Sequence, residues 1–413
     1  MAKYQRKVQS TIEKSETLSM QLELPMAELI AGACDSIEAL CGEIGLKIML
    51  AVMQREIEMK VGPWGQQRFY RHGKQPGYVV YAGRKLALER PRLRQPKQGE
   101  VPLESYKAFQ SDGRMQRAVA RRILRNCSMR NYAGALDDCL EGYGIQRSSV
   151  SRHFKATTTQ ELKELLERPV PKELLALLID GKYFPKQCII VALGIDKEGR
   201  KHVLGLWEGA TENTTVVKGL LEDLVARGLD PEQKLLMVMD GGKALRKAVD
   251  QVFGCQAVVQ RCRVHKQRNV VEHLPEEKQE QAIWRLRAAW SKADPKDAEK
   301  ELYAIVKWLE GISPMAARSL REGLEETLTL QKLGINARLA HCLSSTNMIE
   351  SCFAHTGSMT QRVKHWRDGR MVLRWAAATL KKAEKSFRRI RGFEHLGQLE
   401  EALCESKSIL KAA

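Results

Sequence analysis

Two apolar runs in this sequence each end in an aspartate followed by glycine. One is ELLALLIDGKYF at residues 173–184, and the other is KLLMVMDGGKAL at residues 234–245. Each run has the length and apolar content of a buried strand, which places Asp180 and Asp240 at predicted strand ends. Asp-Gly is also ordinary turn chemistry, so a single case would mean little. Its repetition favours a shared role for the two carboxylates.

The elements around these runs predict a mixed α/β sheet. CIIVALGID and KHVLGLWEG follow the first run after short connections, which is typical of a three-stranded antiparallel meander. A helix, the Asp240 strand, a second helix and a fifth strand over CQAVVQRCRVH come next. This order is of the ribonuclease-H type. If the first and fourth strands are neighbours, Asp180 and Asp240 meet at one end of the sheet.

Two carboxylates held close together repel each other, and a divalent cation relieves that repulsion. Oxygen ligands suit Mg²⁺, for which Mn²⁺ can substitute. Gly241 and Gly242 keep bulk away from Asp240, so a phosphodiester backbone can approach. Asp180 and Asp240 are therefore predicted to be metal ligands and catalytic residues.

Phosphoryl transfer with two metals needs a further carboxylate, for which Glu350 is the candidate. It lies in STNMIES, three to four residues into a helix predicted to begin at Thr346 and Asn347. The basic residues that follow, including Arg362 and Lys364, suit phosphate contacts. A single Glu on a helix is most often a solvated charge, and its place after a five-strand core is what singles it out.

Composition points to a polyanionic partner. The chain of 413 residues has 68 Lys and Arg against 50 Asp and Glu, a net charge of +18. A protein this basic usually binds nucleic acid, although general basicity without such a partner is the alternative. No window is apolar enough to span a membrane, and no signal peptide is evident. Ten cysteines without a CxxC pair indicate reduced thiols in a cytoplasmic protein.

The first 170 residues are predicted to form a mainly helical DNA-binding region. A long helix over 25–60, with a break near Gly42 to Gly45, precedes a basic hairpin over 78–94 and a linker over 91–102. Residues 132–155 have the layout of a helix-turn-helix, whose alternative is a helical hairpin in a core. The DNA-contacting residues predicted on its second helix are Arg147, Ser149, Arg152, His153 and Lys155.

Several of these motifs together resemble the Mutator-like transposases of bacterial insertion sequences, members of the DDE transposase superfamily. The resemblance is carried by IDGKYF, LGIDKEGRKHVLGLWEGATEN, VMDGGKALRKAV, QRCRVHKQRNV and STNMIES, in that order, and spans about residues 20 to 390. On the family's motifs the three acids are Asp180, Asp240 and Glu350, and the Cys/Asp-x-x-His element is Cys262 with His265. The chain departs from the pattern at SMTQRVKHWRDG, where an arginine-rich segment is expected.

The resemblance implies a ribonuclease-H-like catalytic core with an α-helical insertion, in a cytoplasmic, nucleoid-associated protein. It also implies Mg²⁺, terminal inverted repeats and target DNA as partners, and a homodimer that brings two ends together. The expected parts are an N-terminal helix and hairpin (1–102), a helix-turn-helix region (103–170), the first part of the core (171–265), the insertion (266–340), the last part of the core (341–395) and a tail (396–413).

The sequence allows more than one role for Cys262 and His265. They are candidates for DNA contact, but core packing of Cys262 with His265 facing the active site or DNA is the alternative. A structural zinc site would need Cys255 and His273 as well, with no second paired motif. The insertion contains Trp284, Trp290 and Trp308. Tryptophans in such a helical segment more often pack in a core than stack on a nucleic-acid base, so we expect core residues.

A DDE transposase is the favoured interpretation. A ribonuclease-H-fold nuclease or resolvase is the enzymatic alternative, but it would not need the N-terminal DNA-binding region. A non-catalytic regulator derived from a transposase is the other, and it would be favoured if one of the three acids were replaced. None is.

Overall fold

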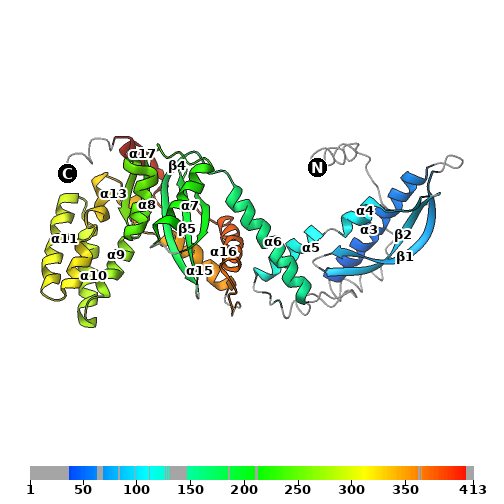
Figure 1. The fold of residues 1–413 in the computed structure, drawn as a ribbon, viewed down its shortest axis with the longest axis horizontal. Coiled ribbons are helices and arrows are strands. Elements are labelled where there is room, and N and C mark those ends of the chain that lie inside the picture. The colour runs from blue at the N-terminus through cyan, green and yellow to red at the C-terminus, as the bar shows by residue number, and fades with distance from the viewer. Residues whose placement is uncertain are drawn as a thin grey trace. The chain divides into compact units, whose positions relative to one another are not determined.

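The computed structural model describes residues 37–62, 68–81, 84–96, 98–110, 112–125, 127, 129, 147–184, 187–209, 213–360, 363 and 365–405. The chain divides into two compact units, shown in Figure 1. One comprises residues 1–115 and 132–146, and the other comprises 116–131 and 147–413. No helix in the described part of the chain is long and apolar enough to cross a membrane.

The first unit combines helices with a small antiparallel sheet. Its elements are α3 (Ile37–Val61), β1 (Tyr70–Tyr81), β2 (Arg84–Gln95), β3 (Gly99–Val101) and α4 (Glu104–Phe109). The strands follow the order β1-β2-β3, and α3 packs on them through Met53 and Ile57. The predicted hairpin is confirmed by the pairing of Tyr81 with Arg84.

Three expectations for this unit need correction. β1 begins at Tyr70, inside a stretch predicted to be turns, and pairs with β2 past an irregularity between Arg71 and Lys74. The predicted linker contains the end of β2 and all of β3, whose charged residues pair across the strands, as Arg92 does with Glu100 at 2.7 Å. The helix α3 is not broken at its glycines. A Cβ on Gly45 would lie 3.2 Å from the Tyr81 ring, so this glycine permits close helix–sheet packing.

The second unit contains a five-stranded mixed sheet. Its strands are β4 (Leu174–Phe184), β5 (Gln187–Asp196), β6 (Lys201–Glu208), β7 (Leu235–Met239) and β8 (Ala257–Arg261), in the order β6-β5-β4-β7-β8. β5 is antiparallel to β4 and β6, whereas β7 is parallel to β4 and β8. The predicted meander and the predicted adjacency of the first and fourth strands are both confirmed.

Helices cover both faces of this sheet because alternate side chains of its strands point to opposite sides. Leu177 and Ile179 of β4 pack with α7 (Thr214–Ala226) and α8 (Lys243–Phe253). Leu178 packs on the other side with α15 (Asn347–Thr360), α16 (Gly369–Glu384) and α17 (Leu396–Glu405). The last three helices come from the far end of the sequence, so the sheet joins segments that are distant along the chain.

Two further helices precede the sheet. α5 (Asp112–Ile123) is followed by α6 (Arg147–Glu167), which packs on α16 through Phe154 and Trp375, with ring centroids 4.5 Å apart. The predicted second helix of the helix-turn-helix therefore exists and extends to Glu167. Its predicted first helix, over 132–140, and the turn after it lie outside the described residues.

Between β8 and α15 the chain is helical, as expected. The elements are α9 (Arg263–Val271), α10 (Glu276–Trp290), α11 (Pro295–Glu310), α12 (Pro314–Arg321), α13 (Thr329–Lys332) and α14 (Ala337–Leu343). Local sequence sets their starts: Asp294 and Ser313 accept backbone N–H bonds as N-caps, each followed by proline. Leu286, Leu302 and Leu320 belong to a separate hydrophobic core beneath these helices.

Leu178→Ala should lower the thermal midpoint of the second unit by roughly 5 to 15 °C. Leu178 is fully buried in the central strand, and removing such a side chain costs about 2–5 kcal/mol. Differential scanning calorimetry measures the shift. Met315→Ala, at a side chain that is 56% exposed, is the control and should change the midpoint by no more than about 2 °C. Equal midpoints for the two variants would contradict this packing.

Candidate active site

The parallel pairing of β4 with β7 brings Asp180 and Asp240 to the same end of the sheet. Ile179 pairs with Met239, after which β7 ends and Asp240 follows directly. The expectation that the first strand also ends at Asp180 is wrong. β4 continues to Phe184 because β5 still pairs with it, Asp180 standing opposite Val191. Asp180 therefore lies where β4 loses its parallel neighbour but keeps its antiparallel one.

Both aspartates are held by the glycine that follows them. The Gly181 N–H donates to Asp180 Oδ1 at 2.8 Å, and the Gly241 N–H donates to Asp240 Oδ1 at 2.6 Å. Asp180 is buried, and this burial raises the pKa of its carboxyl. The charge of His265 and a hydrogen bond from Thr346 act against that rise, whereas the nearby charge of Asp240 adds to it.

Glu350 reaches this region from α15, which begins at Asn347 as predicted. The Thr346 carbonyl accepts the N–H groups of Ile349 at 2.8 Å and Glu350 at 3.3 Å. The guanidinium of Arg268 donates to Glu350 Oε1 at 2.7 Å. This hydrogen bond lowers the pKa of Glu350 in spite of partial burial. Glu350 is thus an anion already paired with a protein cation.

Cys262 and His265 connect the end of β8 to the start of α15. The Cys262 N–H donates to the Met239 carbonyl at 2.8 Å, and Cys262 is the N-cap of α9. Its Sγ accepts the Thr346 N–H at 3.4 Å, and the Thr346 hydroxyl lies 3.4 Å from His265 Nδ1. Cys262 is fully buried, so no surface of its side chain is open to DNA in this structure.

The two side chains perturb each other's ionisation. The hydrogen bond with Cys262 raises the pKa of His265 to about 9, against the effect of burial, and the charges of Asp180 and Asp240 add to the rise. Burial alone would raise the pKa of Cys262, but its bonds with His265 bring the net pKa below the usual value. His265 is therefore a cation near neutral pH in the metal-free chain.

Asp180, His265 and Glu350 form one cluster, in which a ligand atom from each lies within 4.8 Å of the other two. Asp240 is outside this trio but next to it, since its charge acts on both Asp180 and His265. The two carboxylates fit a hard divalent cation such as Mg²⁺ or Mn²⁺. His265 offers a ring nitrogen to the same cluster, and a neutral imidazole is also a metal ligand.

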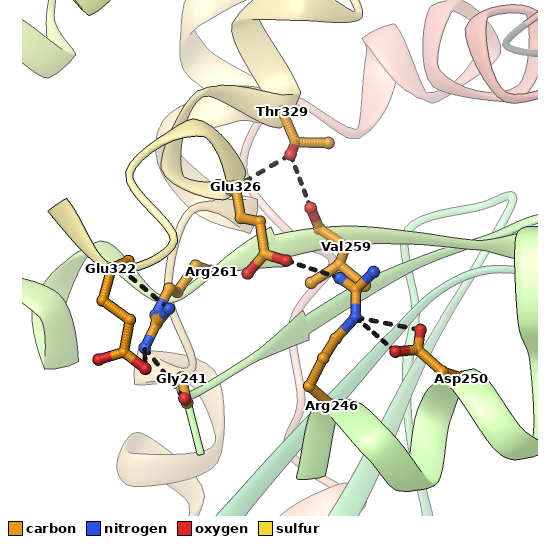
Figure 2. A network of polar contacts seen from close by, with 8 residues as sticks. All are labelled: Gly241, Arg246, Asp250, Val259, Arg261, Glu322, Glu326 and Thr329. Atoms are coloured by element: carbon orange, nitrogen blue, oxygen red, sulfur yellow. Dashed lines mark hydrogen bonds and ion pairs between the residues drawn. The ribbon is translucent and has the colours of Figure 1, made fainter. Parts of the chain in front are cut away.

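Arg261 supports the loop that carries Asp240. Figure 2 shows its guanidinium donating to the Gly241 carbonyl at 2.9 Å and to the Glu322 carbonyl at 3.1 Å. A Cβ added to Gly241 would lie 1.6 Å from this guanidinium, and one added to Gly323 would lie 2.0 Å from it. Both glycines are therefore needed for close approach, and Gly323 also has a positive φ of 63°. The helical segment is anchored next to Asp240 by this arginine.

Other bonds in Figure 2 strengthen the same junction. Arg246 of α8 donates to Glu326 at 2.7 Å and to Asp250 at 3.0 Å. Lys266, almost fully buried, donates to the carbonyls of Ser319 at 2.6 Å and Glu322 at 2.7 Å at the end of α12. Burial lowers the pKa of Lys266 to about 8. Sequence analysis missed these anchors because their acceptors are mainly backbone carbonyls, which have no sequence signature.

Five of the other predicted DNA-contacting residues lie on α6. On α6, Arg147, Arg152 and Lys155 are exposed, and Ser149 and His153 are half-buried. Their DNA contacts stay predictions. Arg362 and Lys364 lie outside the described residues.

The structure also shows the surroundings of Cys262 and of the three tryptophans. Within the described ranges, the one cluster of three or more potential metal ligands contains no cysteine, which argues against zinc at Cys262. Trp290 is buried and Trp308 is half-buried beside Arg285. Trp284 is 72% exposed, unlike the core residue that was expected.

Comparison with known proteins identifies the family of this chain. Residues 13–389, which include all three acids, match the family model described as "Transposase, Mutator family". The chain belongs to the Mutator family of transposases. It is 28% identical over 324 residues to the transposase for insertion sequence element ISRM5 of Rhizobium meliloti (strain 1021), covering 75% of this chain and 78% of that protein. It is 30% identical over 253 residues to the transposase for insertion sequence element IST2 of Acidithiobacillus ferrooxidans, covering 59% and 83%.

Gly241→Ala should destabilise this transposase by about 1–3 kcal/mol, because the new methyl group displaces Arg261 from two carbonyls. Gly219→Ala is the matched control. Its Cβ would meet nothing closer than 3.8 Å, and alanine is favoured over glycine within a helix such as α7. Thermal unfolding followed by circular dichroism compares the two variants. A midpoint for Gly241→Ala at or above that of the wild type would show that Arg261 does not constrain the loop.

Proposed function

We propose that this Mutator-family transposase is the DDE enzyme of an insertion sequence. In this proposal it binds the element's terminal inverted repeats, cleaves DNA at the ends and joins the 3′-OH ends to target DNA. The observation that carries it is the convergence of Asp180 and Glu350, within 4.8 Å, beside Asp240 at one end of a mixed sheet. Asp180, Glu350 and the neighbouring Asp240 come from three separate segments of the chain, and their proximity supports the proposed chemistry.

We infer a ribonuclease-H-like core from the sheet. Three antiparallel strands followed by two parallel ones, in the order β6-β5-β4-β7-β8, support that assignment. In the same proposal the helices between β8 and α15 are an insertion into the core, and α6 with the N-terminal unit binds DNA. The helix-turn-helix assignment rests on sequence alone. A homodimer would bring two element ends together.

Asp180, Asp240 and Glu350 would hold the divalent cations, Mg²⁺ with Mn²⁺ as a substitute. When bound, two such cations supply Lewis-acid stabilisation of the attacking and leaving oxygens of an in-line displacement at phosphorus. The chain's own groups do the rest. The space that Gly241 leaves is occupied by the Arg261 guanidinium, which holds the Asp240 loop, and not by a phosphodiester as the sequence predicted. Burial of Asp180 keeps bulk water from its carboxylate.

His265 and Arg268 would act through their positive charge. They balance Asp180 and Glu350 in the DNA-free chain, as their hydrogen bonds and pKa shifts show. Arg268 is 55% exposed in its side chain, so it can exchange Glu350 for a phosphate without leaving a buried charge unpaired.

Asp180→Asn, Asp240→Asn and Glu350→Gln should each lower end cleavage by at least about 1000-fold, because a lost metal ligand removes several kcal/mol of transition-state stabilisation. The assay uses a supercoiled plasmid that carries the DNA flanking the coding region on both sides. DNA binding, read by gel shift, should stay within about twofold. Asp196→Asn is the control. Asp196 is also a buried aspartate at a strand end, but it stands opposite Leu174 in the β4–β5 ladder, at the other end of the sheet.

Full cleavage by the Asp180→Asn chain would overturn the proposal. Cleavage without joining would favour a ribonuclease-H-fold nuclease or resolvase. Specific binding with neither activity in the wild type would favour a regulator.

Mn²⁺ binding provides a test that needs no DNA. Wild-type and Asp196→Asn chains should bind Mn²⁺ equally, as read by the loss of the free-ion signal in electron paramagnetic resonance. Asp180→Asn should weaken binding at least tenfold, because it replaces a charged ligand of the cluster with a neutral one. Arg268→Gln should strengthen it, because Glu350 then loses the cation that is hydrogen-bonded to it. No dependence on Asp180 would place the metal elsewhere.

A further inference from the structure

A basic cavity of about 1260 Å³ opens beside Glu350 in the second unit. Its walls come from β6, α9, α10, α14, α15 and the segment before α17. Six cationic side chains line it, Lys201, Arg263, Arg268, Arg287, Arg338 and Arg391. The one carboxylate in its lining is Glu350, so the groove has a large excess of positive charge.

One of these arginines, Arg263, is engaged in bonds within the protein and is not available to a ligand. Arg263 donates to the carbonyls of Thr327 at 2.9 Å and Trp290 at 3.4 Å, and its guanidinium lies 5.9 Å from the Trp290 ring centroid. It fixes the floor of the groove by joining α9 to α10 and α13. The remaining cations determine what the groove can bind.

Three exposed arginines of the groove, Arg287, Arg338 and Arg391, are not held in strong ion pairs. Arg287 donates to the amide oxygen of Gln267 at 3.3 Å. Among the described residues, neither Arg287 nor Arg391 has a carboxylate within 4.0 Å. Arg338 pairs with Glu394 at 3.0 Å, but both side chains are largely exposed, and such surface pairs contribute about 0–1 kcal/mol. A phosphate can therefore compete for each of the three.

The spread of the charges favours a chain of phosphates over a single small anion. Arg287 lies on α10, Arg338 on α14 and Arg391 beyond α16, so each comes from a different wall. Arg268 marks the inner end, because its guanidinium bonds to Glu350. Asn347 and Ser351, also in the lining, add neutral hydrogen-bond donors of the kind that contact phosphate oxygens.

We propose that this groove binds the sugar–phosphate backbone of DNA and leads it to Asp180 and Glu350. The inference rests on the proposed function and deepens it, because it identifies a DNA path next to the acids and separate from α6. Contacts to phosphate do not depend on base identity, so the groove binds DNA of any sequence.

The first experiment removes three charges from the groove. The variant Arg287→Gln, Arg338→Gln and Arg391→Gln is compared with a control that loses three exposed lysines of α11, Lys296→Gln, Lys300→Gln and Lys307→Gln. Both lose the same net charge, but the α11 residues do not line the groove. The probe is a fluorescein-labelled duplex of arbitrary sequence, and fluorescence anisotropy gives the affinity over a range of salt concentrations.

The groove variant should flatten the dependence of log K on log salt by about 2 to 3, since each phosphate contact contributes a slope of about 0.9 in duplex DNA. The control should keep the slope of the wild type. Equal slopes for wild type and groove variant would overturn the inference, as would equal losses in the groove and control variants.

A second measurement uses the unmodified chain. Cys342 lines the groove and is half-exposed, whereas Cys255 and Cys404 are exposed and lie outside it. Saturating duplex should slow the alkylation of Cys342 by iodoacetamide at least fivefold, as read by mass spectrometry, and leave the other two rates unchanged. Unchanged alkylation of Cys342 under saturation would exclude DNA from the groove.

Failure of the inference and failure of the proposed function are distinguishable. A wild type that cleaves element ends but shows no DNA protection of Cys342 is a DDE enzyme whose DNA follows another path. A wild type that protects Cys342 but never cleaves has the groove without the proposed chemistry.

Discussion

The parallel pairing of β4 with β7 is the constraint on which the candidate site depends. It aligns Ile179 with Met239, so that Asp180 and Asp240 emerge side by side at the same end of the sheet. Antiparallel pairing at this position would send the second aspartate to the opposite end. Because helices cover both faces of the sheet, slippage by one residue would exchange the side chains that pack in the two cores and break the packing on both faces, so this register is strongly specified.

Charge balance is the second feature that organises the site. Three carboxylates gathered at a buried strand end would repel one another, and the DNA-free chain compensates with cations of its own. The hydrogen bond with Cys262 and the charges of the two aspartates raise the pKa of His265, and Arg268 pairs with Glu350. The buried thiol of Cys262 thus has a positioning role: it joins the end of β8 to the start of α15 and maintains the charge of His265.

The helical segment between β8 and α15 is tied to the sheet by two buried cations and one half-buried cation that bond to backbone carbonyls. Arg261, Arg263 and Lys266 follow one another within six residues and reach the ends of α10 and α12 and the turn before α13. Arg261 bonds at the same time to the carbonyl directly behind Asp240. The same stretch of chain therefore caps the sheet, anchors the helices and forms one wall of the basic groove. This arrangement gives the groove and the acids a common rigid support.

The sequence by itself predicted the mixed α/β sheet and supplied the three candidate acids. Apolar runs, N-caps such as Asp294 and the repeated Asp-Gly are local signals, and they sufficed to predict the meander, the helices and the start of α15 at Asn347. Only the tertiary structure decided which strand-end aspartates meet. Asp196 also ends an apolar strand, but the antiparallel direction of β5 places it at the other end of the sheet. Bonds from Arg261 to carbonyls, the extension of β4 past Asp180 and the gathering of arginines beside Glu350 were equally invisible in the sequence. Each depends on residues that are distant along the chain, and backbone acceptors carry no residue identity from which such contacts could be predicted.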